Sequence, residues 1–389
     1  MKTACFTLVA LFAVHPLAYA ETSEAEIKSI ADRILATDGN VVRDSTLPGL
    51  PITSVSFGKK PIPAGLLLEL AKLRKLKRIN FSYSPFSDDD LKELAGIEQF
   101  DTLDLIGTKV TGVGFKHLSK HKRLATLFLH NAQINDAGLK EIANLPALET
   151  LAVADNPITD AGLKELPRLK TLRHLDLMYT AVTDEGLKQL VGMKLISLTI
   201  PDKAKTDAGL KHLLAITRNT SELYVGSWKV TDEGLKGFET KDLRTVDLSN
   251  SQVTDLGLQS LARAEYLSRL NLRGCKVTGE GLAALAALPY LKDVDLTLCP
   301  VTDDSLREVA KVKSITTLQL DDTKVTEAGL TELARLPSLE SLCISNIPLT
   351  EVGVENLAKL RQLKVLQISG VAKEVRAKLR DALPNCTIR

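Results

Sequence analysis

The chain has 389 residues, among them 50 Lys or Arg and 48 Asp or Glu, and its formal net charge is +2. The two signs of charge alternate along the sequence, so composition gives no electrostatic reason to expect a nucleic acid or an anionic membrane as a partner. Aromatic residues make up 4% of the chain, a small share that is typical of a core filled by leucine rather than by rings.

Residues 1–20 have the pattern of a signal peptide. Lys2 supplies a positive charge, residues 6–14 are apolar, and Ala18-Tyr19-Ala20 fits the small-x-small cleavage pattern. We expect cleavage after Ala20 and export of residues 21–389 to the periplasm, the cell surface or the medium, without insertion of the mature chain into a membrane. The alternative, an uncleaved membrane anchor, is disfavoured because the apolar run is too short to span a bilayer comfortably.

Residues 21–50 are expected to cap the N-terminal end of the fold. Ser23 and Glu26 have the spacing of a capping box, in which each side chain accepts a hydrogen bond from the backbone of the other residue at a helix start. Apolar residues then follow at helical spacing, which predicts a helix that covers the first repeat. These residues are Ile27, Ile30, Ile34 and Leu35.

A phrase of 24 residues recurs over residues 51–370, in about fourteen copies of varying quality. It reads Leu-x-x-Leu-x-Leu-x-x-Thr-x-Val-Thr-Asp-x-Gly-Leu-x-x-Leu, and plain copies occupy residues 124–142, 148–166 and 172–190. A fixed period in this range is typical of a solenoid, because each unit can bury its apolar face only by stacking on its neighbours.

Each unit is predicted to contain one strand and one short helix. Alternation in Leu-x-Leu sends two leucines inward and the residue between them outward. Thr-Asp-x-Gly-Leu starts the return segment, where a Thr or Asp side chain can cap the free N–H groups of a helix. The predicted fold is therefore an α/β solenoid, curved like a horseshoe, with parallel strands on the concave face and short helices on the convex face.

The repeat is irregular over residues 195–230. Successive Gly-Leu steps there are separated by 23, 25 and 23 residues, Lys205 stands where Val is usual, and Trp228, the only Trp, takes a Thr position. We expect a local kink or bulge in this region. After it the repeats resume, and residues 371–389 are expected to form a C-terminal cap with a helix and a last half-strand.

Two cysteines, Cys275 and Cys299, occupy the same repeat position in adjacent units. Strand spacing would place them roughly 5 Å apart, but parallel Cβ vectors make the geometry of a disulfide poor. A bridge and a pair of buried thiols are both open, and the thiols are favoured. Cys343 falls on an outward strand position, which predicts an exposed thiol.

With the repeat written out, the chain resembles the leucine-rich repeat family over roughly residues 50–389. It looks most like the Thr-Asp-x-Gly-Leu class of exported bacterial proteins, and it is also similar to the cysteine-containing repeats of F-box proteins. The resemblance implies a scaffold for recognition. No F-box-like helical segment precedes the repeats, so a ubiquitin-ligase adaptor is not implied, and the absence of Cys-rich caps favours a bacterial source.

The outward strand positions are candidates for binding, because the core does not fix their identity. They are the residues between the two strand leucines of each unit. In chain order these residues are Asn80, Asp104, Phe128, Ala152, Asp176, Thr199, Tyr224, Asp247, Asn271, Asp295, Gln319, Cys343 and Gln367.

Aromatic side chains, two histidines and a methionine gather in the N-terminal two-thirds of this face. Exposed rings on a rigid surface are effective interface anchors, so we predict a protein-binding footprint centred on residues 128–228, with Tyr179 and Trp228 as the strongest candidates. The alternative is ordinary strand propensity, which also favours rings on a sheet face. The candidate residues are Tyr83, Phe128, His130, His174, Met178, Tyr179, Tyr224 and Trp228.

The function that these patterns favour is a non-catalytic secreted or periplasmic scaffold that binds a protein on its concave face. Two alternatives stay open: a module that binds carbohydrate or cell wall, and a structural envelope protein without a discrete ligand. No cofactor or metal is expected. Calcium at Asp293, Asp295, Asp321 and Asp322 is conceivable, but a solvated charged face is favoured, and an open sheet offers no closed pocket for catalysis.

Overall fold

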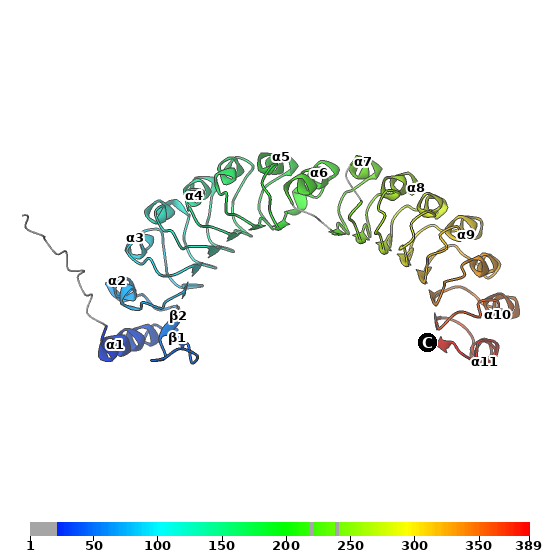
Figure 1. The fold of residues 1–389 in the computed structure, drawn as a ribbon, viewed down its shortest axis with the longest axis horizontal. Coiled ribbons are helices and arrows are strands. Elements are labelled where there is room, and N and C mark those ends of the chain that lie inside the picture. The colour runs from blue at the N-terminus through cyan, green and yellow to red at the C-terminus, as the bar shows by residue number, and fades with distance from the viewer. Residues whose placement is uncertain (1–21, 218–220, 238–240) are drawn as a thin grey trace, which may run out of the picture.

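The computed structural model describes residues 22–217, 221–237 and 241–389. The predicted signal peptide, residues 1–20, lies outside these ranges. The described chain forms an arc of stacked units, with strands along its inner side and helices along its outer side (Figure 1). The predicted α/β horseshoe is therefore confirmed, with parallel strands on the concave face and short helices on the convex face.

Helix α1 (Glu24–Leu35) closes the N-terminal end. It begins at Ser23, where the capping box with Glu26 is present, and its inner face is buried around Ile30 and Ile34. Leu35 was expected on the same face but is 47% exposed. The reason is helical geometry, because consecutive residues lie about 100° apart around the axis and Leu35 directly follows the buried Ile34.

An antiparallel strand that the sequence did not reveal covers the first edge of the sheet. β1 (Asn40–Arg43) pairs with β2 (Ile52–Ser56), and the register shifts between Val42 and Arg43. The first parallel strand of the repeats therefore keeps no open edge on this side, which is how sheets avoid pairing with other chains.

The strands form two eight-stranded sheets, in the orders β1 to β8 and β9 to β16. From β2 onward, neighbouring strands within each sheet pair parallel and in register, so that Leu151 and Leu175 lie side by side. The strands beyond β2 are β3 (Arg78–Asn80), β4 (Thr102–Asp104), β5 (Thr126–Phe128), β6 (Thr150–Ala152), β7 (His174–Asp176), β8 (Ser197–Thr199), β9 (Glu222–Tyr224), β10 (Thr245–Asp247), β11 (Arg269–Asn271), β12 (Asp293–Asp295), β13 (Thr317–Gln319), β14 (Ser341–Cys343), β15 (Val365–Gln367) and β16 (Thr387–Ile388).

The return segments are short α-helices or 3-10 turns, because a 24-residue unit leaves little length for a helix. In chain order they are α2 (Leu66–Glu69), η1 (Leu70–Lys72), α3 (Leu91–Leu94), η2 (Val113–Leu118), α4 (Asp136–Ile142), η3 (Gly162–Arg168), α5 (Asp184–Leu187), η4 (Lys188–Leu190), η5 (Asp202–Ala204), α6 (Asp207–Ile216), α7 (Asp232–Leu235), α8 (Asp255–Leu258), η6 (Gln259–Leu261), η7 (Glu280–Leu285), α9 (Asp303–Val309), η8 (Gly329–Arg335), α10 (Glu351–Leu357) and α11 (Lys373–Ala382).

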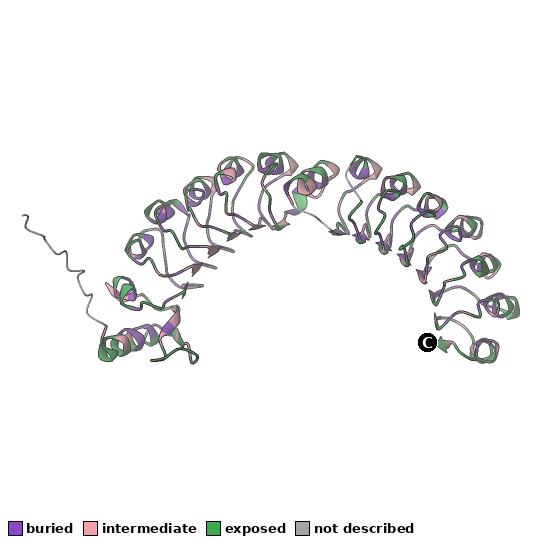
Figure 2. Cartoon of the chain, viewed as in Figure 1, coloured by how far each residue is buried: buried purple, intermediate pink, exposed green. Residues whose placement is uncertain are grey.

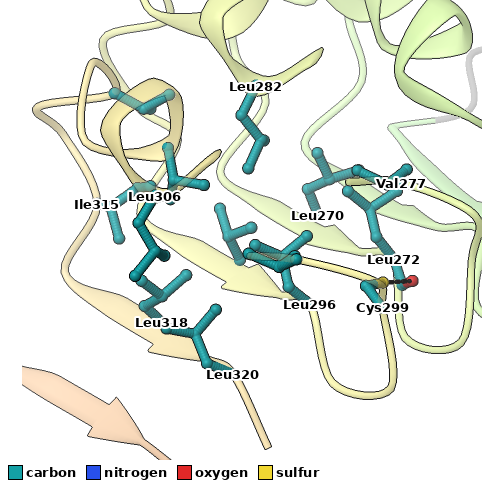
Figure 3. Packing of buried hydrophobic residues seen from close by; sticks show 14 of the residues in the cluster. Leu270, Leu272, Val277, Leu282, Leu296, Cys299, Leu306, Ile315, Leu318 and Leu320 are labelled. Atoms are coloured by element: carbon teal, nitrogen blue, oxygen red, sulfur yellow. Dashed lines mark hydrogen bonds between the residues drawn. The ribbon is translucent and has the colours of Figure 1, made fainter. Parts of the chain in front are cut away.

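A continuous row of leucines between strands and helices makes up the core. Buried residues line the inside of every unit along the arc (Figure 2). In the C-terminal half, Leu270 and Leu318 lie in β11 and β13, and Leu296 directly follows β12. They belong to the same cluster as Leu282 and Leu306 from the helices (Figure 3). Each unit thus buries its apolar residues against the next, as a solenoid requires.

The Thr-Asp step of the repeat joins neighbouring units. The carboxylate of Asp160 accepts hydrogen bonds from the N–H and the Oγ1 of Thr183, one repeat further on, each at 2.7 Å. The same pair of bonds recurs at Asp88–Thr111, Asp136–Thr159, Asp207–Thr231, Asp232–Thr254, Asp255–Thr278, Asp303–Thr326 and Glu327–Thr350.

The Thr-Asp step was also expected to cap the helices, and it is the Thr side chain that does so. Thr206, Thr231, Thr254 and Thr350 accept a hydrogen bond from the first turn of their helices, whereas Thr183 makes no such bond. The Asp mainly fastens one unit to the next.

The sheet breaks inside the irregular region, where a local kink or bulge was predicted. Among the described residues, no strand pairing joins β8 to β9, and isolated bridges link Leu195 to Thr217 and Thr206 to Lys229. The helices stay packed across the break, since α6 contacts both α5 and α7. Trp228 lies at this junction and packs against the hydrophobic clusters on both sides of it.

Both cysteines of the adjacent pair are free and buried. The Sγ of Cys299 donates to the carbonyl of Leu272 at 3.0 Å (Figure 3), and the Sγ of Cys275 donates to that of Leu248 at 3.0 Å. Each thiol satisfies a backbone carbonyl of the preceding unit, so the position is a structural one.

The C-terminal end carries a helix and a half-strand, the two elements expected there. α11 packs against α10 and buries Leu379. β16 pairs with β15, with Ile388 beside Leu366. These elements cover the last core leucines.

Candidate binding surface

The concave face is built from the outward strand positions, but three of the thirteen predicted positions are buried. Asp104 is 1% exposed, because Arg78 on the neighbouring strand covers it with an ion pair of 2.6 Å from Nε to Oδ2. Ala152 is too short to emerge between its neighbours. Cys343 was predicted to be an exposed thiol, but it is 7% exposed and donates to the Oε1 of Gln367.

Asp104 is the most confined charge on this face. Its Oδ1 is buried without a hydrogen-bond partner. Burial raises the pKa of the Asp104 carboxyl, while its hydrogen bond and ion pair with Arg78 act in the opposite direction.

At the centre of the predicted footprint, the short side chain of Ala152 on β6 lies between larger side chains on the two neighbouring strands. Phe128, Ala152 and Asp176 lie level with one another on β5, β6 and β7. His130 reaches across β6 to Asp176, with 3.4 Å between Nε2 and Oδ2. The side chains of His130 and Asp176 can meet above β6 because the residues of that strand beneath them, such as Ala152, are small.

Two further candidates border this patch. The Phe128 ring lies 6.4 Å from the His130 ring, centroid to centroid. His174 is exposed and stands at the other end of β7, level with Thr150. Met178 is half-buried, and its N–H donates to Asp176. The patch on β5 to β7 therefore combines apolar, imidazole and carboxylate groups.

Tyr83 and Tyr179 stand in a backbone conformation that disfavours tyrosine. Their φ angles are +59° and +58°, in the left-handed region, and their side chains are 62% and 70% exposed. A non-glycine residue pays roughly 1–2 kcal/mol there, and short polar residues or glycine tolerate it best. The same turn position in other units holds Gly107, Asn131, Asp155, Ser227, Asn250, Gly274, Leu298, Asp322, Asn346 and Gly370.

The ring of Tyr83 lies close to the backbone of the next unit. A Cβ added to Gly107, which occupies the same turn position one repeat later, would be 2.5 Å from Cδ1 of Tyr83. Gly107 therefore leaves the space that this ring fills.

The sheet break divides the predicted footprint. Tyr224 is 60% exposed but lies on β9, in the second sheet, where its hydroxyl donates to Glu222. Trp228 is half-buried between the two hydrophobic clusters. Five of the eight predicted residues thus gather on or just after β5 to β7, Tyr83 lies outside that patch, and Tyr224 and Trp228 lie beyond the break.

Sequence reasoning missed an exposed stack on the rim of the arc. The rings of Tyr266 and Tyr290 are 6.2 Å apart and nearly parallel, and the guanidinium of Arg244 lies 5.4 Å from the centre of the Tyr266 ring. Both tyrosines directly precede the first leucine of their repeat. A search of that position along the period would have found them.

The carboxylates considered for calcium are each engaged by the protein. Asp293 pairs with Arg269 at 3.2 Å, and Asp295 accepts from the N–H of Thr297. Within residues 22–217, 221–237 and 241–389, no group of three His, Cys, Asp or Glu side chains could hold a metal ion. Over the same residues, no helix is long and apolar enough to cross a membrane.

Comparison with known proteins agrees with this architecture. The family model described as Leucine Rich repeat matches residues 144–166, 168–191, 241–262 and 264–286. A comparison with curated proteins finds no match. A leucine-rich repeat protein from Leptospira interrogans has a similar structure over 95% of this chain and 98% of its own, with 18% sequence identity and a TM-score of 0.55. This likeness concerns the fold.

Two further solved structures resemble the chain more loosely. An internalin from Listeria monocytogenes has 17% identity and a TM-score of 0.44, with 86% of each chain covered. The leucine-rich repeat ectodomain of a plant membrane receptor kinase from Arabidopsis thaliana has 15% identity and a TM-score of 0.40, with 87% of this chain and 56% of that chain covered.

Proposed function

Because this chain is a leucine-rich repeat protein, we propose that it is a non-catalytic exported scaffold that binds a protein partner on its concave face. Solenoids of this kind present an extended concave surface that generally serves recognition. The proposed contact area is the patch on β5 to β7, bordered by Tyr179.

The observation that carries this proposal is the placement of Tyr179. Its ring is 70% exposed and its φ is +58°, so the residue strains the backbone without filling any space in the core. Strain and exposure together are typical of a position kept for binding. Other turns of the same kind hold Asn131, Asp155 and Asn250, which shows what the fold alone prefers there.

The chemistry of the patch suits a peptide or protein surface. Tyr179 and Phe128 offer rings for apolar contacts, and these residues are common anchors at interfaces. His130 and Asp176 already face each other at 3.4 Å, and together they present hydrogen-bonding groups beside the rings. The thiols and the Thr-Asp bonds, by contrast, are used within the fold.

The test is site-specific photo-crosslinking in a mixture of envelope and culture-medium proteins. A benzophenone amino acid replaces Tyr179 in one variant and Leu256 in the other, since Leu256 is 68% exposed and lies in α8 on the convex side. We expect one defined protein to be crosslinked from position 179 and not from position 256. Unlabelled wild type should compete for it, and a Tyr179→Asn variant should compete less well.

Two outcomes would overturn the proposal. Equal crosslinking from both positions would indicate nonspecific contact rather than a concave site. Absence of any crosslinked protein, together with retention of a polysaccharide by the wild type, would favour the carbohydrate-binding alternative; absence of both ligands would favour a structural envelope component.

A further inference from the structure

Basic residues are concentrated on one side of the arc, in the segments that lead into the strands. We define the basic rim as the six residues before each strand from β3 to β15, leaving out β9 and taking 241–244 before β10. These segments contain 21 Lys or Arg and 6 Asp or Glu. They are residues 72–77, 96–101, 120–125, 144–149, 168–173, 191–196, 241–244, 263–268, 287–292, 311–316, 335–340 and 359–364.

Acidic residues dominate the opposite side. We define the acidic rim as the nine residues that begin two positions after each strand from β3 to β14. These segments contain 20 Asp or Glu and 7 Lys or Arg. They are residues 82–90, 106–114, 130–138, 154–162, 178–186, 201–209, 226–234, 249–257, 273–281, 297–305, 321–329 and 345–353.

Within each of the two sheets, backbone hydrogen bonds join neighbouring segments of each rim. On the basic rim, the N–H of Arg173 donates to Glu149 and that of Lys292 donates to Ser268, each one repeat away. On the acidic rim, the N–H of Asn131 donates to Ala154. The helices are seen nearly end-on in Figure 1, so the two rims form the two broad sides of the arc.

The alternation of charge along the sequence therefore disappears in the folded chain. Because the repeat has a fixed period, most basic residues of these segments fall on one side of the arc and most acidic residues on the other. A formal net charge of +2 is therefore compatible with two oppositely charged surfaces. The expectation that electrostatics favours no anionic partner does not hold for the basic rim, because association depends on the local field of a surface rather than on net charge.

Part of the basic rim has a structural use. Cations near helix C-termini satisfy free carbonyl groups, as Lys170 does at Pro167 and Arg173 does at Lys170 and Leu172. The described structure contains no ion pair or side-chain hydrogen bond for Lys122 or Lys194. These two side chains are exposed and remain available to an external anion.

Two hollows open between units of the basic rim. One, of about 390 Å³, is lined by Lys120, Lys122 and Arg123 together with Glu98 and Gln99. The other, of about 400 Å³, has Lys170, Arg173 and Lys194 around apolar residues that include Val191 and Met193. The second hollow thus places three cations around an apolar floor.

Exposed apolar side chains lie among these cations. Val191 is 48% exposed and Ile196 is 62% exposed, on either side of Lys194 in the sequence. Further along the same rim, Tyr266 and Tyr290 are 45% and 51% exposed. Cations mixed with aliphatic and tyrosine side chains are the combination that binds the headgroup region of a bilayer.

We propose that the basic rim docks on the surface of an anionic phospholipid bilayer. Lys122 and Lys194 contact phosphate groups, and Val191 and Ile196 enter the headgroup layer without crossing it. A bilayer is favoured over a soluble polyanion because the cations lie along one broad side of the arc and apolar side chains project beside them. The concave face stays free, so this docking is separate from the proposed protein binding.

The test measures binding of residues 21–389 to vesicles of phosphatidylcholine alone and of phosphatidylcholine with phosphatidylglycerol, by co-sedimentation. We expect binding only to the anionic vesicles, with weakening as salt screens the charges. Lys122→Glu/Lys194→Glu should lower the binding constant by at least about tenfold, given roughly 1 kcal/mol for each basic residue near an anionic surface. Ile196→Ser should lower it further.

The matched control is Lys229→Glu/Lys276→Glu, which makes the same change of net charge at two exposed lysines of the acidic rim. It should keep most of the vesicle binding. Equal losses in the two double variants would overturn the proposal, because net charge alone would then explain them. Binding to a soluble anionic polysaccharide without binding to anionic vesicles would overturn it as well. Circular dichroism of each variant verifies that the fold is intact.

Discussion

The carboxylate of Asp160 and the α-carbon of Gly186 are neighbours in adjacent repeats, so close that a Cβ on Gly186 would lie 2.1 Å from Oδ1 of Asp160. The same carboxylate binds the N–H and hydroxyl of Thr183 at 2.7 Å. Three residues of the recurring Thr-Asp-x-Gly phrase thus serve one contact between units. The phrase is explained by stacking, without reference to any ligand.

The first prediction follows from this contact. Gly186→Ala should destabilise the chain by about 1–3 kcal/mol, the usual effect of overpacking, although helix propensity alone would favour Ala by about 1 kcal/mol. Asp160→Ala should cost about 1.5–3 kcal/mol through its charged hydrogen bonds. In the double variant the two effects should be less than additive, because removal of the carboxylate makes room for the new methyl group.

Chemical denaturation of the four chains measures this coupling. Gly96→Ala is the control, since a Cβ at Gly96 would meet no atom within 4 Å, and it should leave stability unchanged or raise it. Strict additivity of Asp160→Ala and Gly186→Ala would show that the two residues do not share the contact.

The second prediction concerns Asp104 and pH. Burial raises the pKa of its carboxyl above the usual value of 3.8, against the lowering effect of Arg78. The folded state therefore holds this proton more tightly than the unfolded state does. The stabilisation from the group is complete below pH 3.8 and is lost as pH rises through the folded pKa. Asp104→Asn carries no charge, so its stability relative to wild type should increase as pH rises from about 4 to 7.

Urea denaturation over this pH range provides the measurement. Asp155→Asn, at an exposed carboxylate on the acidic rim, serves as the comparison for general effects of charge. If the stability of Asp104→Asn relative to wild type decreased as pH rose, the ion pair with Arg78 would outweigh burial. A difference that stayed the same at every pH would likewise contradict the raised pKa of Asp104.

The third prediction separates stability from binding at Tyr179. Tyr179→Asn relieves a side chain held at φ +58°, and asparagine tolerates that region. The free energy of unfolding should therefore rise by about 0.5–1 kcal/mol, while affinity for the crosslinked partner falls. The same change at Leu298, which has φ +60° and lies outside the patch, should stabilise the chain without affecting the partner. Destabilisation by Tyr179→Asn would mean that the ring packs against the fold.

The fold could be predicted from the sequence because the period repeats one local solution many times. Leucine spacing fixed which residues face the core, and the break followed from the unequal Gly-Leu steps around residues 195–230. The repeat pattern does not show which side chains of neighbouring units contact one another. Asp104 looked exposed from its strand position, yet Arg78 from the next strand covers it.

The candidate site was harder to predict for the same reason. The strand position of Phe128 and the turn position of Tyr179 could be read from the repeat, but the contact between His130 and Asp176 depends on the small residues of β6 that lie between them. The separation of charge onto two rims was also hidden, because it becomes visible only when residues one period apart are stacked. Trp228 shows a further limit of the pattern: this ring in an irregular unit was predicted to bind a partner, and the structure shows that it also packs between two parts of the core.

The fourth prediction concerns the reactivity of the cysteines. Burial raises the pKa of the Cys299 thiol to about 12 and that of Cys343 to about 11. The thiolate is the form that attacks a maleimide, so both residues should react very slowly at pH 8. Cys386 is only half-buried and should be labelled first. Mass spectrometry after brief maleimide treatment measures the order in which the cysteines are labelled. Rapid labelling of Cys299 in the native chain would contradict its burial.

The fifth prediction concerns the junction at Trp228. Among the residues that the structure describes, the two sheets share no strand pairing there and are linked only by isolated bridges. Coupling between the halves therefore rests mainly on the helices and on this ring, which packs against both clusters. Trp228→Ala should cost about 2–4 kcal/mol, somewhat less than a fully buried ring. In a solenoid, weaker contact between neighbouring units lowers cooperativity, so urea unfolding should also become broader or biphasic. Tyr266→Ala removes a ring from the rim and should keep the transition sharp. A lower midpoint with an unchanged slope for Trp228→Ala would show that the halves are coupled without this ring, by the helices and the isolated bridges.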